Sequence, residues 1–301
     1  MSSDIQRLNR HLASALPSAT YRIIDRVAER RAQGATIISL CAGEPDFDTP
    51  EPVRDAAIRA IGQGHTRYTQ VAGARSLREA VAAKFRGENG LDVGWQDTLV
   101  CNGGKQVIYN ALAATLNEGD QVIIPAPYWV SYPEMVQLCG AQSCFVTCHA
   151  ASGFKLTAAA LAAAITPQTR WLILNSPSNP TGAVYSRDEL AALADVLLAH
   201  PHVLILADDI YEHLIFDDQL FHTLAQVEPR LAARTLTMNG VSKAYAMTGW
   251  RIGFATGPRW LLQAMEKLQG QQTSGAGSIS QQAALAALEG PKDFIHSSRI
   301  A

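Results

Sequence analysis

RWLILNSPSNPTGAVYSRDELAALADVLLAHPHVLILA, residues 170–207, holds two short apolar runs on either side of a helical pattern. The runs are typical of buried strands, and the pattern over 187–199 predicts a helix. Ser186 followed by Glu189 forms a capping box, which marks the start of that helix. A strand, a helix and a second strand in this order predict a crossover between two parallel strands.

The same alternation extends over most of the chain. Strands are predicted at 36–40, 98–101, 121–125, 142–146, 170–174, 202–207, 234–238 and 251–256, and helices at 51–62, 75–88, 104–117, 131–139, 187–199 and 258–269. Only about a dozen residues separate the last two strands, too few for a helical crossover, so one strand is expected to be antiparallel. We therefore expect an α/β fold with a mostly parallel sheet and helices on both faces.

Composition and charge indicate a soluble protein with small-molecule ligands. Of the 301 residues, 48% are hydrophobic and 17% charged, which is enough apolar sequence for a large core. The net charge is −2 without any long run of like charges, so we expect neither nucleic acid nor a membrane as partner. No apolar stretch reaches the roughly 18 residues of a membrane span and no signal peptide is recognisable, so we expect a cytoplasmic location.

The five cysteines predict neither a disulfide framework nor a metal site. Their number is odd in a long chain, which indicates free thiols. Cys139, Cys144 and Cys148 lie close together with a histidine, but their spacing matches no zinc motif. The alternation in this segment instead predicts a strand.

Residues that can carry chemistry gather where the predicted strands end, and in open α/β sheets ligands bind at the carboxyl ends of strands. The exit segments are 102–105 (NGGK), 127–129 (PYW), 175–182 (NSPSNPTG), 208–211 (DDIY) and 239–243 (NGVSK). They hold two of the six lysines, whereas Lys84, Lys267 and Lys292 fall on polar faces of predicted helices. A lysine at a strand exit can act as a Schiff-base nucleophile or proton shuttle, and its ordinary alternative is a solvated surface residue.

The other strand-exit residues also have two interpretations each. The glycine pair at 103–104 could open a helix as an anion cradle or form a tight turn. Arg251 could bind a phosphate or make a surface ion pair. Asp208 follows an apolar run, so its carboxylate needs a cationic partner unless it caps the next turn. Trp129 could be a core residue or a stacking surface, and the hydroxyl of Tyr211 could reach the same ligand.

Taken together, these residue types match one ligand, pyridoxal 5′-phosphate (PLP). PLP combines a phosphate, a flat ring with a basic nitrogen, a phenolate oxygen and an aldehyde. A protein that binds it must supply a Schiff-base lysine, an acidic partner for the ring nitrogen and a phosphate site.

Seven segments then carry a resemblance to a known family: GEPDFDTP (43–50), TRYTQVAGARSLREAV (66–81), NGGKQ (102–106), PYWVSYPEM (127–135), NSPSNPTGAVY (175–185), DDIYEHL (208–214) and NGVSKAYAMTGWRIG (239–253). They resemble class I aminotransferases of PLP fold type I, more narrowly the bacterial aspartate aminotransferase branch that includes aspartate/prephenate enzymes. The resemblance covers roughly residues 20–295, in the order of the family.

For the fold, the resemblance implies a seven-stranded, mostly parallel sheet with one antiparallel strand and helices on both faces. It divides the chain into an N-terminal segment that is part of a small domain (1–45), a large PLP-binding domain (46–290) and the start of a helix (291–301). That helix would lead into a C-terminal small domain that is largely missing from these 301 residues. A homodimer is also implied.

For the site, the resemblance implies catalytic roles for Lys243, Asp208 and Tyr211. Lys243 would be the Schiff-base lysine and carry the proton that moves during the reaction, and Asp208 would keep the ring nitrogen protonated. Tyr211 and Asn179 would donate to the 3′-oxygen of the ring. The other implied cofactor contacts are Gly103, Gly104, Lys105, Trp129, Ser242, Arg251 and, from the partner subunit, Tyr68. The implied substrate contacts are Gly43, Trp129, Asn179 and Lys105, and no metal is expected.

Two features depart from the family pattern. Gly240 stands three residues before Lys243, where a phosphate-binding serine is common, so Ser242 could take that role. The family's small domain carries an arginine for the substrate α-carboxylate, and Arg299 is expected to be an ordinary solvated residue instead. The resemblance also predicts a cis Asn179–Pro180 bond.

The expected function is transfer of an amino group from an L-amino acid, with aspartate as the expected donor, to 2-oxoglutarate in a ping-pong cycle of PLP and pyridoxamine phosphate. One alternative is a PLP-dependent C–S lyase that catalyses β- or γ-elimination. The other is a PLP-binding fragment impaired in catalysis.

Overall fold

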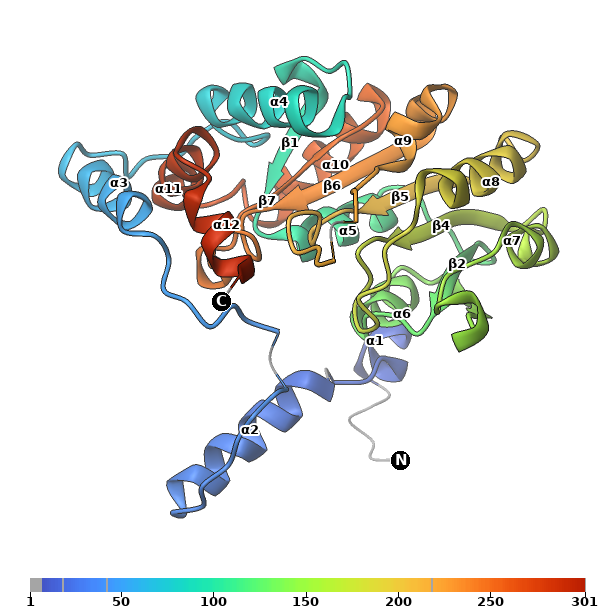
Figure 1. Ribbon diagram of the computed structural model, residues 1–301, viewed down its shortest axis with the longest axis horizontal. Helices are drawn as coiled ribbons and strands as arrows, with labels where there is room; N and C mark the ends of the chain where they lie inside the picture. The colour runs from blue at the N-terminus through green and yellow to red at the C-terminus, as the bar shows by residue number, and fades with distance from the viewer. Residues whose placement is uncertain (1–6, 18, 42, 218, 301) are drawn as a thin grey trace.

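The computed structural model describes residues 7–17, 19–41, 43–217 and 219–300. A twisted sheet lies in the middle of the molecule, with helices on both of its faces (Figure 1). The helix α2 and the segment after it extend away from this layered body, whereas α1 lies beside α6.

In the described part of the chain the sheet has seven strands in the order β1-β7-β6-β5-β4-β2-β3. They are β1 (Thr98–Cys101), β2 (Gln121–Ala126), β3 (Gln142–Thr147), β4 (Thr169–Asn175), β5 (Leu204–Asp208), β6 (Thr235–Gly240) and β7 (Gly253–Thr256). Neighbouring strands are parallel except at β7, which is antiparallel to both β1 and β6. The predicted sheet with one antiparallel strand is therefore confirmed.

The α-helices are α1 (Arg10–Ser14), α2 (Ala19–Ala32), α3 (Glu51–Gly62), α4 (Arg75–Asn89), α5 (Gly104–Ala113), α6 (Ser131–Leu138), α7 (Ala158–Ala164), α8 (Arg187–Leu198), α9 (Leu224–Val227), α10 (Arg259–Gln272), α11 (Ser278–Glu289) and α12 (Asp293–Ile300). Short 3₁₀-helices are η2 (Trp95–Asp97), η3 (Ala150–Ser152), η4 (Pro229–Arg234) and η5 (Thr248–Trp250). The predicted capping box starts α8. The Ser186 amide donates to Glu189 Oε2 at 2.8 Å and the Glu189 amide donates to Ser186 Oγ at 3.2 Å.

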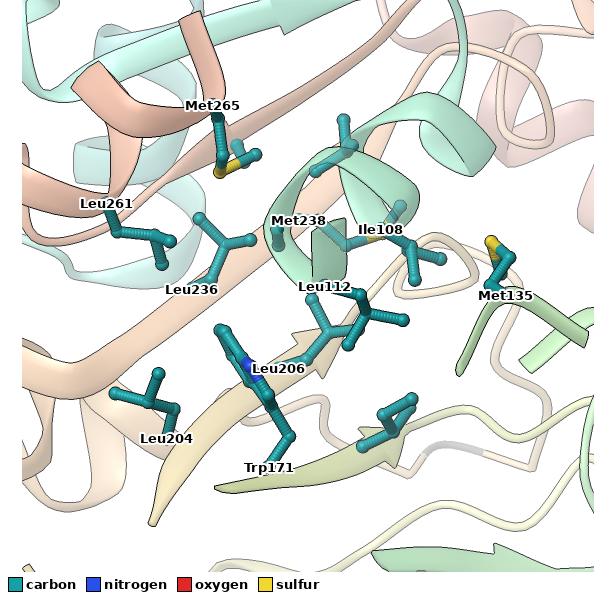
Figure 2. Packing of buried hydrophobic residues seen from close by; sticks show 14 of the residues in the cluster. Ile108, Leu112, Met135, Trp171, Leu204, Leu206, Leu236, Met238, Leu261 and Met265 are labelled. Atoms are coloured by element: carbon teal, nitrogen blue, oxygen red, sulfur yellow. The ribbon is translucent and has the colours of Figure 1, made fainter. Parts of the chain in front are cut away.

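The core lies on both sides of the sheet because side chains alternate along each strand. In β4, Trp171 belongs to the cluster with α5, α6 and α10, whereas Leu172 belongs to the cluster with α7 and α8. Figure 2 shows Trp171 beside Leu206, below Leu112 of α5. Burial on both faces explains why the strands read as continuous apolar runs.

The segment 36–40 is not a strand, contrary to the prediction. It is irregular, and Ile38 and Leu40 are 90% and 93% exposed. No strand in the described ranges pairs with it. A strand forms only where a neighbour accepts and donates its backbone hydrogen bonds, and an apolar pattern does not show where that neighbour lies.

Lys84 is buried in α4, although the helical pattern predicts a solvated residue. Its ammonium group forms an ion pair with Glu212 and donates to Asn89 Oδ1 at 2.6 Å. The Asn89 amide in turn donates to Glu212 Oε2 at 2.6 Å. Glu212 follows β5 and meets α4 only in the folded chain. The sequence of the helix therefore does not show the partner that compensates the charge of the buried lysine.

None of the described helices is long and apolar enough to cross a lipid bilayer. All five cysteines are free thiols, and Cys144 lies in β3, where a strand was predicted.

Candidate active site

Loops at the carboxyl ends of three neighbouring parallel strands form the candidate site. β4 ends at Asn175, β5 at Asp208 and β6 at Gly240, and Asn175 pairs in register with Asp208. Because the strands run in the same direction, the segments after them lie at one edge of the sheet. The order β6-β5-β4 therefore brings Lys243, Asp208 and Asn179 together from distant parts of the sequence.

Asp208 is a buried carboxylate, 3% exposed. The hydroxyl of Tyr132 donates to its Oδ2 at 2.6 Å, and the Ile210 amide donates to its Oδ1 at 3.3 Å. Burial raises the pKa of Asp208 to about 6, although both hydrogen bonds and the charge of Lys243 lower it. A carboxylate held this deep is stable in its charged form only with a cationic partner.

Lys243 lies in the loop after β6 and is half-buried. Its Nζ donates to the Gly43 carbonyl at 2.5 Å and lies 5.8 Å from the centroid of the Tyr211 ring. Burial lowers the pKa of Lys243, assisted by Arg251 and opposed by Glu44 and Asp208. A lowered pKa increases the neutral amine, the form that attacks carbonyl carbons and accepts protons.

A hydrogen-bonded chain links Asn179 and Tyr211 to the β5 end. The Asn179 amide group lies 3.5 Å from the Tyr211 hydroxyl. The Asn179 backbone amide donates to Asn175 Oδ1 at 2.7 Å, and Asn175 Nδ2 donates to the Asp208 carbonyl at 2.8 Å. Burial and the charge of Asp208 raise the pKa of Tyr211 to about 12, so its hydroxyl keeps its proton. The Asn179–Pro180 bond is cis, as predicted.

The glycine pair lies at the start of α5, where the neighbouring side chains come too close for a Cβ at either position. Gly103 has φ +88°, and a Cβ built on it would collide with the guanidinium of Arg251. A Cβ on Gly104 would lie 2.6 Å from Met238 Cε. Arg251 also has a left-handed backbone, φ +56°, which delays the start of β7 beyond the predicted residue 251.

Two cations therefore lie at the N-terminus of α5. Lys105 Nζ is 5.0 Å from the Trp129 ring centroid, and burial and Arg251 both lower the pKa of Lys105. The Arg251 side chain donates to the Thr248 carbonyl at 2.8 Å and remains exposed. Free amides of a helix start, a guanidinium and an ammonium group together suit an anion such as a phosphate.

The remaining predicted residues fall in different surroundings. Ser242 is buried directly before Lys243, and Gly43 meets Lys243 through its carbonyl. Tyr68 is 95% exposed, so a single chain does not bring its ring into the buried cluster. Arg299 is exposed, as expected.

Tyr132 is the site residue that the sequence analysis missed. It is 2% exposed in α6 and packs edge-on against Trp129, with ring centroids 5.3 Å apart. The available signal was a hydroxyl-bearing residue on the buried face of a predicted helix, three positions after Trp129. Such a hydroxyl needs a partner, but the pattern alone did not point to Asp208.

These surroundings fit PLP on two observations of the structure. The Asp208 carboxylate is buried and would be matched by a protonated ring nitrogen. The absence of a side chain at Gly103 lets the Arg251 guanidinium lie against the start of α5, and a guanidinium beside a helix N-terminus suits a phosphate. The fold and the site thus define an enzyme of PLP fold type I.

Comparison with known proteins identifies the family. The model for class I and II aminotransferases matches residues 35–300, and the chain belongs to this family of PLP-dependent enzymes. A probable aspartate/prephenate aminotransferase from Rhizobium leguminosarum bv. phaseoli is 59% identical, over 94% of this chain and 71% of the relative. The aspartate/prephenate aminotransferase of Cereibacter sphaeroides is 56% identical, over 96% of this chain and 72% of the relative.

Solved structures agree with the family. The aspartate aminotransferase from Rhizobium meliloti superposes with a TM-score of 0.94 at 50% identity, over 97% of this chain and 73% of that one. An aspartate aminotransferase from Thermus thermophilus, determined with maleate, has a TM-score of 0.94 at 44% identity, over 98% of this chain and 76% of that one.

Proposed function

We propose that this aminotransferase moves the amino group of L-aspartate to 2-oxoglutarate. The observation that carries the proposal is the placement of the Lys243 amine and the buried Asp208 carboxylate at the ends of adjacent strands, beside an anion cradle. When bound, PLP supplies a carbonyl carbon that reacts with amines and a ring that withdraws electrons.

Lys243 holds the cofactor and moves the proton. Its lowered pKa increases the fraction of neutral amine, the form that can act as a general base. The Gly43 carbonyl and the Tyr211 ring limit where Lys243 Nζ can lie. Lys243 therefore takes up and returns the proton from one fixed position in the site.

Asp208 would stabilise positive charge on the ring nitrogen of the bound cofactor, and Tyr211 and Asn179 would donate to its ring oxygen. Trp129 would supply an aromatic surface for the cofactor ring. The phosphate would be held at the glycine pair 103–104 by the amides of Gly104 and Lys105, by Ser242 and by Arg251, since the Gly103 amide itself donates to the Cys101 carbonyl at 2.8 Å.

The acidic substrate is supported by Lys105. Its ammonium group lies at the Trp129 ring, where it can bind a carboxylate remote from the reacting carbon. Gly43, Asn179 and Trp129 complete the substrate contacts. The names of the relatives and the maleate in the Thermus structure, a dicarboxylate, support the same class of substrate.

We further propose a cytoplasmic homodimer in which Tyr68 reaches the partner's site. Its 95% exposure leaves the ring available for such a contact. The division into segments 1–45, 46–290 and 291–301 also stays a prediction, and it includes residues outside the described ranges.

The test is a comparison of kcat/KM for aspartate, alanine and leucine with 2-oxoglutarate as acceptor, with Lys243→Ala as the inactive reference. We expect kcat/KM for aspartate to exceed the values for alanine and leucine. Substrates without a second carboxylate leave the Lys105 ammonium group unpaired, which weakens their binding. Equal values would reject aspartate as the substrate. Release of ammonia and pyruvate from cystathionine without any 2-oxo acid would instead show a C–S lyase.

A further inference from the structure

The hydroxyl of Tyr132 is placed behind the Asp208 carboxylate. It donates to Oδ2 at 2.6 Å, whereas the Ile210 backbone amide donates to Oδ1 at a longer 3.3 Å. Tyr132 is thus the side chain of the described chain that hydrogen-bonds to this carboxylate. Its ring is fixed by burial in α6 and by the edge-on contact with Trp129.

The direction of this hydrogen bond is settled by the two protonation states. Burial and the charge of Asp208 raise the pKa of Tyr132 well above 10, so the phenol keeps its proton. A neutral phenol donates, and the carboxylate accepts. The short bond therefore favours the charged form of Asp208, and its loss would leave that charge with less compensation inside the protein.

We propose that Tyr132 is a positioning residue for the reaction, which keeps the Asp208 carboxylate charged and oriented toward the cofactor ring. This rests on the proposed role of Asp208 as partner of the ring nitrogen. Asp208 and the ring nitrogen compete for one proton. Without the Tyr132 hydroxyl, the Asp208 carboxylate becomes a stronger base than it is in the unmodified protein. The ring nitrogen is then less fully protonated, and the ring withdraws electrons less well.

The test variant is Tyr132→Phe, which removes the hydroxyl and keeps the ring against Trp129. Its matched control is Tyr185→Phe. Tyr185 is also buried, at 3% exposure, and its hydroxyl accepts from the Leu156 amide at 2.6 Å rather than meeting Asp208. Both variants lose one buried hydroxyl, so a difference between them reports on Asp208.

The first readout is the titration of the Asp208 carboxyl carbon by NMR in protein free of PLP, with the signal assigned by Asp208→Asn. A lost hydrogen bond to a charged group corresponds to a rise of about one to two pH units in the midpoint. We expect this rise in Tyr132→Phe and none in Tyr185→Phe. An unchanged midpoint in Tyr132→Phe would overturn the proposal.

The second readout is PLP affinity and the pH dependence of the visible absorbance of bound PLP. We expect about tenfold or greater weakening in Tyr132→Phe, and no further weakening when the same change is made in Asp208→Asn. An equal loss in both backgrounds would show a merely structural tyrosine and reject the proposal. This double-mutant comparison remains decisive if Tyr132→Phe lowers stability, because both members of the pair carry that loss.

In the loaded enzyme we expect kcat for aspartate to fall by about ten- to a hundredfold with KM nearly unchanged, since Tyr132 touches no substrate atom in this scheme. A raised Asp208 midpoint in protein that binds no PLP would instead reject the proposed function and leave the Tyr132–Asp208 relationship intact.

Discussion

Lys243 Nζ donates a hydrogen bond to the carbonyl oxygen of Gly43 at 2.5 Å, across 200 positions of sequence. The same two segments are joined again where the Thr49 hydroxyl donates to the Ala246 carbonyl at 2.6 Å and the Trp250 indole donates to Thr49 Oγ1 at 3.0 Å. The segment around Gly43 is therefore held directly on the loop that carries the lysine. The Gly43 carbonyl oxygen therefore lies within hydrogen-bond distance of the Lys243 amine, the group proposed to react with the cofactor.

Lys243→Ala should abolish the visible absorbance that PLP acquires when it is linked to the protein, because the other site cations cannot reach the same position. Lys267→Ala is the matched control, since Lys267 is exposed on α10. We expect the control to retain the band. A band of equal intensity in Lys243→Ala would assign the linkage to another lysine.

Gly103→Ala should weaken PLP binding by about tenfold or more, because the new methyl group displaces the Arg251 guanidinium and costs a charge-assisted hydrogen bond. Gly119→Ala is the control, as Gly119 also has a left-handed φ, +93°, but open space around it. Both variants should lose about 1 kcal/mol of unfolding free energy through backbone strain. Equal PLP affinities in the two variants would contradict the phosphate cradle.

Asp208→Asn should stabilise the protein free of PLP at neutral pH. The folded pKa of Asp208 is about 6, above the ordinary 3.8, so the charged form is disfavoured on folding. This cost is absent below pH 3.8, grows as the pH rises and is complete above pH 6, at about 3 kcal/mol. Urea unfolding should show a higher unfolding free energy for Asp208→Asn than for the unmodified protein at pH 8. The difference should be smaller at pH 4.

At pH 8, saturating PLP should make the unmodified protein more stable than Asp208→Asn. The unmodified protein binds PLP more tightly, and a ligand stabilises a protein more the more tightly it binds. If Asp208→Asn is the less stable protein at pH 8 without PLP, the buried carboxylate is compensated by groups already in the chain.

Lys84→Ala should lower the unfolding free energy by about 3–5 kcal/mol, because it removes the buried ammonium group that compensates the charge of the Glu212 carboxylate. Replacement of both partners, Lys84→Met with Glu212→Leu, should recover most of the loss. Lys267→Ala, on the surface, should change stability by less than about 0.5 kcal/mol. Denaturant midpoints measure the stability of all three variants. A Lys84→Ala midpoint equal to that of Lys267→Ala would show that the Lys84–Glu212 pair contributes nothing to the unfolding free energy.

The sequence was most informative where local pattern and local structure coincide. The buried strands, the Ser186 capping box and the strand-exit position of Asp208 follow from short-range pattern, and the structure contains all three. The roles at the site came from the resemblance, because single strand-exit residues such as Arg251 have an ordinary alternative. Their grouping at one edge depends on strand order, which no local pattern contains.

The misses share a physical cause, a partner distant in sequence. Lys84 is buried because Glu212 reaches it from the turn after β5, and Tyr132 enters the site because its hydroxyl meets Asp208 at the end of that strand. The segment 36–40 has the pattern of a strand, but no strand among the described residues pairs with it. In each case the side chain's environment is decided by tertiary contacts rather than by propensity.

The insertion of β7 between β1 and β6 has a consequence for biosynthesis. Thr98 of β1 pairs with Thr256 of β7, so β1 and the glycine cradle that follows it have no sheet neighbour until nearly the whole sheet has left the ribosome. At translation rates of about 5–20 residues per second, this open edge persists for roughly ten seconds or more. The nascent chain is thus exposed to wrong strand pairing at the unpaired β1 edge during that interval.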